Sequence, residues 1–331
     1  MKTVSVVLCT YNGEKYIREQ IDSILNQEYL PKEIIIQDDG STDGTLSVIQ
    51  EYAEKEPIIK IHKNNRGRGI NSNFFDAMSK ASGDYIAISD QDDIWAKEKL
   101  KWQVESIGDK LLCSGISVPF PMENRDTRLV NYNLLRILHC NCLPGHTFLL
   151  SRELLKMVPD IEKTPDFTMY DCLLALVAAS FNSIVYIEKP LVYHRMHQES
   201  ATYTSSVNRK KSLRNICSHV INDFRLVQEL KDEVREIRKE FLHFMMKIQS
   251  SEEVYADAIT MLKLETSQSR WDFLRLQLFC LRHCDKLFYV TEKKTPLTML
   301  RGLFFPISYY EYYRGLSKRH LATHTSVSTA S

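Results

Sequence analysis

The first part of the chain alternates between short apolar runs and segments with helical spacing. The runs 3–8, 33–37, 58–61 and 84–89 are rich in Val and Ile and end in polar residues, which is typical of buried β-strands. Between the first two runs, apolar residues recur every three or four positions over 16–25, and this spacing predicts an amphipathic helix. Repeated alternation of this kind predicts an α/β fold with a single doubly wound, mostly parallel sheet.

The pattern is looser after residue 100. Two further apolar runs, 111–118 and 146–150, predict strands, and 169–180 predicts a buried helix. The segment 183–200 predicts a strand that leads into a polar loop. From about residue 208 onward, the spacing is helical and many residues are basic. A helical region is therefore expected to follow the sheet.

These patterns divide the chain into three predicted parts. A sheet domain is expected over 1–205, a largely helical region over 206–322, and a disordered Ser/Thr-rich tail over 323–331. Residues 1–205 hold 22 Lys and Arg against 28 Asp and Glu, whereas residues 206–331 hold 21 against 14. Net charges of −6 and +7, concealed by the overall charge of +1, indicate parts with different partners.

Composition limits the class of protein and its compartment. With 331 residues, 44% hydrophobic and 26% charged, the chain has a globular composition, which excludes a disordered protein. No charged and apolar leader opens the sequence, and its longest apolar run is too short to cross a bilayer. The eight cysteines are scattered through apolar segments, which suits a reducing compartment. A cytoplasmic location is therefore expected.

Polar and acidic residues follow three of the predicted strands. The first strand runs into "CTYNGEKY" (9–16), the second into "DDGSTDGT" (38–45) and the fourth into "DQDD" (90–93). Because ligands of open parallel sheets bind beyond the carboxyl ends of the strands, we expect one concave acidic site at this edge.

The segment "DQDD" places three carboxylates within four positions. Asp90, Asp92 and Asp93 repel one another unless a cation or hydrogen-bond donors compensate their charge. Carboxylate oxygens suit Mg²⁺ or Mn²⁺, which commonly bridge protein carboxylates to the phosphates of a substrate. The alternative is a solvated helix N-terminus before "IWAKEKL", where acidic residues favour the helix dipole.

The segments "VVLCTYNGEKYI", "IIIQDDGSTDGT" and "GDYIAISDQDDIW" together resemble the family 2 glycosyltransferases, most of all bacterial rhamnosyltransferases of surface-polysaccharide assembly. The resemblance covers about the first 205 residues. It implies a fold of the nucleotide-diphospho-sugar transferase type and an inverting, metal-dependent enzyme. Such an enzyme moves a sugar from a nucleotide-diphosphate donor to a saccharide or lipid-linked glycan acceptor, in O-antigen or capsule biosynthesis.

The resemblance also implies roles for individual residues. Asp171, in "MYDCLL", corresponds to the catalytic base, and His197, in "YHRMHQES", to the histidine of the closing loop. His194 has no counterpart and is expected to be an ordinary strand-end residue. The ion would be Mg²⁺ or Mn²⁺, and either Asp92 or Asp93 would be its direct ligand. The implied nucleotide-binding residues are Thr10, Tyr11, Asn12, Glu14, Asp39 and Asp90, and the implied metal-binding residues are Asp92, Asp93 and His197.

Other interpretations of these segments stay open. Asp171 could instead cap the helix that follows it. The protein could bind a nucleotide-sugar without catalysis, or be a nucleotidyltransferase, although "CTYNGEKY" lacks the glycine-rich basic loop expected of the latter. "HCNCLPGH" offers a zinc site formed by His139, Cys140, Cys142 and His146, at spacings poor for structural zinc.

The C-terminal part mixes basic residues with large apolar ones. The segments 209–216, 270–288 and 297–320 fit helices that lie in an anionic membrane interface, or that pack on the sheet domain or a partner. We expect peripheral contact with the inner face of the plasma membrane, and no nucleic-acid partner.

Overall fold

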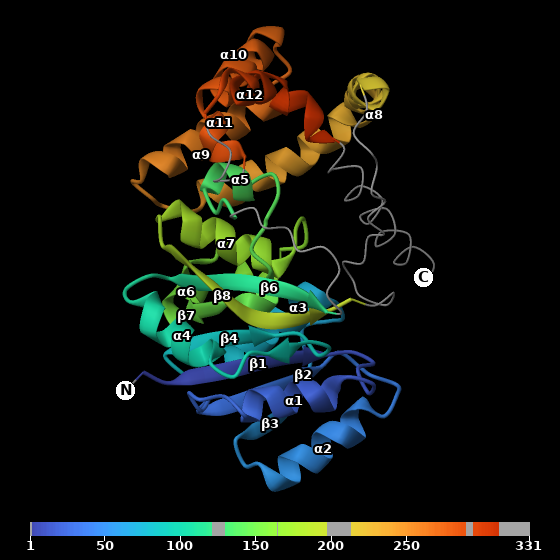
Figure 1. Cartoon of the computed structure of the whole chain (residues 1–331), viewed down its shortest axis with the longest axis vertical. Helices are drawn as coiled ribbons and strands as arrows, with labels where there is room; N and C mark the ends of the chain where they lie inside the picture. Colours follow the sequence, from blue (N-terminus) through green and yellow to red (C-terminus); the bar gives the residue numbers. More distant parts are fainter. Residues whose placement is uncertain (1, 121–129, 164, 197–212, 289–293, 311–331) are drawn as a thin grey trace. The chain divides into compact units, whose positions relative to one another are not determined.

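The computed structural model describes residues 2–120, 130–163, 165–196, 213–288 and 294–310 (Figure 1). The chain forms two compact units. The sheet unit comprises Met1–Thr127 and Asn141–Tyr203, and the helical unit comprises Arg128–Cys140 and Thr204–Ser331. The division into domains 1–205 and 206–322 stays a prediction. In the structure, segment 128–140 groups with the later helices.

The sheet unit contains an eight-stranded sheet in the order β3-β2-β1-β4-β7-β6-β8-β5. Strands β1 to β4 are parallel, β7 runs antiparallel to its neighbours β4 and β6, and β6 pairs in parallel with β8. This arrangement confirms the predicted α/β fold with a mostly parallel sheet. The strands are β1 (Val4–Thr10), β2 (Glu33–Asp38), β3 (Ile59–Lys63), β4 (Tyr85–Ser89), β5 (Ile94–Trp95), β6 (Leu112–Phe120), β7 (Leu149–Ser151) and β8 (Ile184–Arg195).

Helices cover both faces of the sheet. On one face, α1 (Ile17–Leu25), α2 (Thr45–Lys55) and α4 (Lys99–Ile107) share an apolar core with Ile36 of β2. Because side chains alternate along a strand, the next residue, Gln37, points to the other face. There its Nε2 donates to the carbonyl oxygen of Asn73 in α3 (2.9 Å). The remaining elements of the unit are α3 (Ile70–Lys80), η1 (Gly145–Thr147), α6 (Arg152–Met157), η2 (Ile161–Lys163) and α7 (Tyr170–Ser180).

The predicted strand over 146–150 is partly wrong. Gly145–Thr147 forms the 3-10 helix η1, and the strand begins only at Leu149. The turn is fixed by Thr147, whose backbone N–H and side-chain hydroxyl both donate to the carbonyl oxygen of Pro144. The apolar pattern of "HTFLL" therefore belongs to a buried turn followed by a short strand.

Helix α4 buries a lysine in the core of the sheet unit. Lys99 is fully buried; its Nζ donates to Gln103 Oε1 (3.0 Å) and lies 3.8 Å from the centre of the Trp95 ring. Burial lowers the pKa of Lys99 to about 7. An unfolded lysine titrates near pH 10.4, so between about pH 7 and 10 the unfolded chain binds more protons than the folded protein. Stability should therefore rise with pH over this range.

The variant Lys99→Met should be more stable than the parent at pH 6, by about 1–4 kcal/mol, because methionine removes a buried charge while filling similar volume. Its advantage should shrink toward pH 9, where Lys99 is neutral in the folded protein. Urea unfolding at both values measures the effect, with the exposed Lys101→Met as control. An equal difference at pH 6 and pH 9 would contradict the assignment of a depressed lysine pKa.

The helical unit confirms the predicted helical region. Its helices are α5 (Leu134–Ile137), α8 (Leu213–Met246), α9 (Glu253–Thr266), α10 (Arg270–Arg282), α11 (Cys284–Leu287) and α12 (Pro296–Ser308). The segment 270–288 forms the two helices α10 and α11, and the tail 323–331 lies outside the described residues. Among the helices that the structure describes, none is long and apolar enough to cross a membrane.

A buried ion-pair network ties segment 130–140 into the helical unit. Glu265 accepts hydrogen bonds from Arg238 Nε and contacts His139 Nε2, both at 2.7 Å. Arg238 also donates to the carbonyl oxygen of Leu138 (2.7 Å). His139 Nδ1 lies 2.9 Å from the carbonyl oxygen of Leu135, so both ring nitrogens of His139 have protein partners. Among the described residues, His139, Cys140, Cys142 and His146 do not come together as a metal-binding group.

Candidate active site

The three polar strand exits lie side by side at one edge of the sheet. Strands β2, β1 and β4 are neighbours, and their register places Thr10 opposite Asp38 and Leu8 opposite Ser89. The loops 11–15, 39–44 and 90–93 therefore leave the sheet together, as the sequence predicts.

Asn12 and Glu14 join the first loop to the second. Asn12 has a φ of +49°, in the left-handed region that asparagine tolerates better than most residues. Its N–H donates to Ser41 Oγ (2.9 Å), and its Oδ1 accepts from the N–H of Thr42 (2.8 Å). Glu14 Oε2 accepts from the N–H of Gly44 (2.9 Å). Both side chains thus shape the loop wall, and their contact with a nucleotide stays a prediction.

Gln91 positions Tyr11, a role that the sequence analysis missed. The Gln91 amide accepts from the Tyr11 N–H (2.8 Å) and donates to the Tyr11 carbonyl oxygen (3.0 Å). This pair of hydrogen bonds holds the first loop against the third. The Tyr11 side chain remains 51% exposed and is available to stack on a ligand.

The two aspartates after β2 differ in their surroundings. Asp38 is buried and accepts hydrogen bonds from Thr10 Oγ1 (3.1 Å) and from the backbone N–H groups of Gly40 and Ser41 (both 2.9 Å). Asp38 therefore holds the loop. Asp39 accepts from Asn64 Nδ2 (2.8 Å) and from the N–H of Gly69 (2.9 Å), so it links this loop to the loop after β3.

Asp93 is the most enclosed carboxylate of the "DQDD" segment. It is fully buried, and its Oδ1 lies 2.9 Å from His194 Nδ1 and accepts from the N–H of Arg195 (3.2 Å). Its Oδ2 lies 3.4 Å from His146 Nδ1 and takes no hydrogen bond from the described residues. Burial alone would raise the pKa of Asp93, but His146 and His194 lower it overall. His194 thus lies in the candidate metal cluster, where the sequence analysis expected only an ordinary strand-end histidine.

His146 joins the cluster from η1 and was missed as a residue of this acidic site. Its Nδ1 lies 3.3 Å from Asp90 Oδ2, its Nε2 lies 2.8 Å from Ser117 Oγ, and its ring stacks on His194 at 4.9 Å. Burial alone would lower the pKa of His146, but the carboxylates of Asp93 and Asp90 raise it overall. His146 was visible in the sequence, but it lay in segment 146–150, which was predicted to be a strand.

The donor set of Asp93, His146 and His194 fits a divalent metal ion. One ligand atom from each residue lies within 4.8 Å of the others, and Asp93 Oδ2 is a buried oxygen that lacks a hydrogen-bond partner among the described residues. Of the other predicted ligands, Asp92 is half-buried and His197 lies outside the described residues. The structure therefore brings Asp93 together with two histidines that the sequence analysis did not assign to the metal.

Asp171 lies in the first turn of α7 with a raised pKa. Burial is the main cause and Asp90 adds to it, bringing the pKa of Asp171 to about 6 against the lowering effect of the Cys172 N–H. Its Oδ1 accepts from that N–H at 2.7 Å, whereas the N-cap position is held by Met169. Neighbouring Tyr170 stacks on Phe74 of α3 with ring centres 4.1 Å apart. A carboxylate with this pKa can accept a proton near neutral pH.

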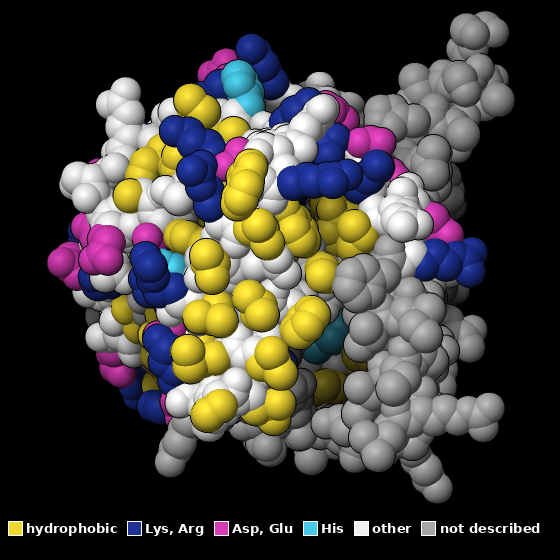
Figure 2. Space-filling view, turned by 90° about the horizontal axis from the view of Figure 1, so that it is seen from above, with side chains coloured by type: hydrophobic (Ala, Val, Ile, Leu, Met, Phe, Trp, Pro, Cys, Tyr) yellow, Lys and Arg dark blue, Asp and Glu magenta, His cyan; other side chains and the backbone are white. Residues whose placement is uncertain are grey.

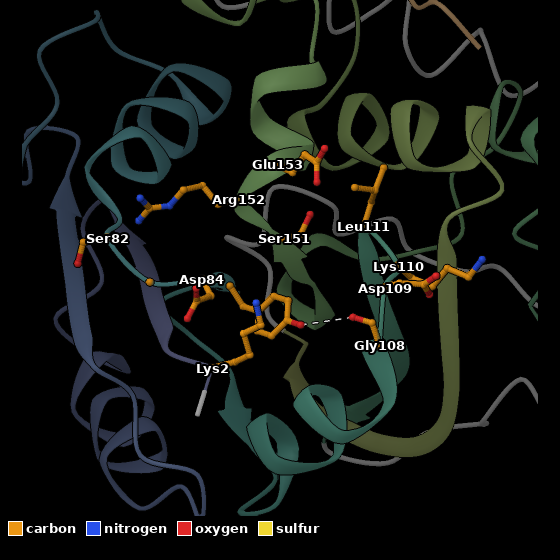
Figure 3. A pocket seen from close by; sticks show the side chains of 12 residues that line it. Lys2, Ser82, Asp84, Gly108, Asp109, Lys110, Leu111, Ser151, Arg152 and Glu153 are labelled. Carbon is orange, nitrogen blue, oxygen red and sulfur yellow. Dashed lines mark hydrogen bonds between the residues drawn. The ribbon is translucent and has the colours of Figure 1, made fainter. Parts of the chain in front are cut away.

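A cavity of about 350 Å³ lies at the opposite edge of the sheet, near the amino ends of β4 and β6 (Figure 3). Among the lining residues, the hydroxyl of Tyr85 donates to the carbonyl oxygen of Gly108 (3.4 Å). Its charged side chains balance, so they favour neither an anion nor a cation. They are Lys2, Lys110 and Arg152 against Asp84, Asp109 and Glu153.

A doubly wound sheet with carboxylates and a candidate metal group at its carboxyl edge is consistent with the sugar-transferring enzymes that the sequence resembles. The profile of Glycosyl transferase family 2 matches residues 5–166. The dTDP-rhamnosyl transferase RfbG of Shigella flexneri is 30% identical over 209 residues, which are 58% of this chain and 72% of that protein. An uncharacterized glycosyltransferase of Haemophilus influenzae is 32% identical over 184 residues, or 52% and 72%. The chain belongs to glycosyltransferase family 2.

The fold has a solved counterpart. The crystal structure of S. aureus TarS 1–349 in complex with UDP-GlcNAc superimposes with a TM-score of 0.58 and 18% sequence identity, covering 95% of this chain and 92% of that one. At this identity the likeness concerns the fold alone. The protein is a glycosyltransferase, and its sheet unit has the predicted α/β fold with a mostly parallel sheet.

Proposed function

We propose that the protein is an inverting, metal-dependent glycosyltransferase that moves a sugar from a nucleotide-diphosphate donor to a saccharide or lipid-linked glycan acceptor. The observation that carries the proposal is the position of Asp171, a carboxylate with a pKa of about 6, within electrostatic range of Asp90 and His146. A proton acceptor and an acidic cluster thus occur together, as sugar transfer requires.

The donor would lie over the loops that follow β1, β2 and β4. The exposed ring of Tyr11 would stack on the base, and Thr10, Asn12, Glu14, Asp39 and Asp90 would line the nucleoside site. A divalent ion held by Asp92 or Asp93, with histidine ligands from His146, His194 or His197, would offset the charge of the diphosphate. Imidazole ligands suit Mn²⁺ better than Mg²⁺, which favours Mn²⁺.

Asp171 would act on the acceptor as a general base. The acceptor hydroxyl loses its proton to the Asp171 carboxylate as its oxygen bonds to the anomeric carbon. The bond from that carbon to the diphosphate breaks on the opposite face, and the nucleoside diphosphate leaves with the electron pair. Attack from the face opposite the leaving group inverts the anomeric configuration.

The product would belong to a cell-surface polysaccharide, such as an O-antigen or a capsule. The relative named as a dTDP-rhamnosyl transferase supports a deoxysugar donor, and the fold counterpart was solved with UDP-GlcNAc, so both nucleotides belong in a test. The proposal places the enzyme in the cytoplasm, at the inner face of the plasma membrane.

A thermal-shift screen of nucleotide-sugars, with and without Mn²⁺, tests the donor assignment. A donor at 100 times its Kd should stabilise the protein by about 2.7 kcal/mol, and only when the metal is present. Failure of every nucleotide-sugar would contradict donor binding. Donor binding with neither hydrolysis nor transfer would indicate an inactive binding protein, and pyrophosphate release from a nucleoside triphosphate would indicate a nucleotidyltransferase.

A further inference from the structure

Helices α10 and α12 of the helical unit carry large apolar side chains that are exposed to solvent. Trp271 is 75% exposed and Leu297 is 68% exposed. In each helix three exposed apolar positions follow the spacing i, i+3, i+7, so they form a stripe along one side of the helix. Phe273 of α10, 39% exposed, lies outside this spacing. We call these two stripes the α10–α12 face, and its residues are Trp271, Leu274, Leu278, Leu297, Leu300 and Phe304.

The other sides of both helices are used for packing within the helical unit. A side chain at Gly302 would come within 2.7 Å of the carbonyl oxygen of Cys280, so the two helix backbones approach closely at this glycine. Gln277 Nε2 donates to the carbonyl oxygen of Leu303 (3.3 Å), and Leu276 and Phe305 are buried. The exposed stripes are therefore additional apolar surface, beyond what the helix pair needs to pack.

Basic side chains accompany the apolar stripes. Residues 270–310 contain seven Lys or Arg against three Asp or Glu, a net charge of +4. Figure 2 shows hydrophobic side chains gathered over α10 and α12, with Lys and Arg side chains beside them. The exposed basic residues are Arg270, Arg275, Arg282, Lys294 and Arg301.

We propose that the α10–α12 face docks on an anionic lipid membrane. Apolar side chains at the centre would enter the boundary between headgroups and acyl chains, and the arginines would contact anionic headgroups. Large exposed apolar patches on soluble proteins mark such interaction sites. A second copy of the chain fits less well, because a two-fold pairing of this face with itself would bring arginines against arginines. The inference rests on the membrane location included in the proposed function, and it assigns the contact surface and its lipid chemistry to the helical unit.

Co-sedimentation of the full chain with phosphatidylcholine vesicles, with and without phosphatidylglycerol, tests the proposal. The protein should bind the anionic vesicles at low salt, bind neutral vesicles far less, and be released from the anionic vesicles as salt rises. Trp271 provides a direct probe: its fluorescence should shift to the blue on binding, and Trp271→Phe should lose that shift while it still binds. The other two tryptophans, Trp95 and Trp102, are buried or half-buried in the sheet unit.

Two variants separate the charged and apolar contributions. The triple variant Arg275→Glu, Arg282→Glu, Arg301→Glu should lower the vesicle partition constant on the order of 100-fold. A control with the same change in charge reverses three exposed residues of α8, namely Arg225, Lys231 and Lys239, each to Glu, and should lose much less binding.

The apolar triple variant Trp271→Ser, Leu278→Ser, Phe304→Ser should lower the same constant by at least about tenfold. Its control is Leu30→Ser in the sheet unit, where the leucine is 71% exposed. All variants should unfold at the parent temperature and hydrolyse donor in solution at the parent rate, which separates this inference from the proposed function.

Three results would overturn the docking proposal. The first is no binding of the parent to anionic vesicles, and the second is equal loss in the face variants and their controls. The third is a concentration-dependent oligomer in sedimentation velocity that the apolar variant dissociates, which would assign the face to contacts between copies of the chain.

Discussion

Replacing Asp171 with Asn should lower kcat for sugar transfer by about 10²–10⁴-fold while the affinity for donor stays unchanged. The amide occupies the same volume but does not accept the proton of the acceptor hydroxyl. Asp166→Asn, an exposed aspartate five positions earlier, is the matched control and should keep the parent rate. Single-turnover transfer and donor titration measure the two effects separately. Parent-like transfer by Asp171→Asn would contradict its assignment as the base and leave it only a structural role in the first turn of α7.

The same residue should set the acid limb of the pH profile. The base must be unprotonated to act, so with a pKa of about 6 for Asp171, kcat should rise as pH increases through 6 and level off above it. The residual rate of Asp171→Asn should lack this limb. A profile of the parent that stays flat between pH 5 and 7 would contradict the assignment of the base.

Replacing Asp93 with Asn should have two effects. Metal-dependent donor binding should weaken by at least about 10–100-fold, whether Asp93 binds the ion or orients its ligands. Stability without metal should also fall, by about 3–5 kcal/mol, because the substitution removes the buried anion that faces His146 and His194. Calorimetric titration with donor and Mn²⁺, together with urea unfolding in a chelator, measures both effects.

The variant Asp92→Asn should be compared with Asp93→Asn in the same two measurements. Asp92 is half-buried, so its loss should weaken donor binding without a comparable loss of stability. If Asp93→Asn loses stability but keeps metal-dependent binding, Asp93 anchors the end of β8 and the ion belongs to Asp92. If both variants bind and turn over donor like the parent, the metal assignment of "DQDD" is wrong.

Local pattern was enough to predict the strand exits, because each apolar run ends at its polar loop within the same few residues. It was not enough for the cluster around Asp93, because His146 and His194 reach it through pairings between strands far apart in sequence. Strand β8 lies between β6 and β5, and an order of this kind depends on the whole fold. "HTFLL" also has strand-like composition, so the sequence did not predict the turn η1 that places His146 at the site.

The C-terminal helices show a similar limit. The sequence combined basic and aromatic residues over 270–288 and 297–320, but periodicity alone did not show which residues pack inward. The packing of Gly302 against Cys280 decides that, and it leaves Trp271 and Phe304 outside. Gln91 had no signal beyond its place between two aspartates, since its role depends on the neighbouring Tyr11 loop.

The membership of segment 130–140 in the helical unit has a consequence for synthesis on the ribosome. Asn131 donates to the carbonyl oxygen of Lys286, 155 positions later, and Leu134, Leu135, Ile137 and Leu138 are buried. At a synthesis rate of roughly 5–20 residues per second, about 10–30 s would pass between the synthesis of these side chains and that of their partners. A nascent chain paused near residue 205 should therefore expose an apolar segment to chaperones, and its release should coincide with the emergence of α9 to α11.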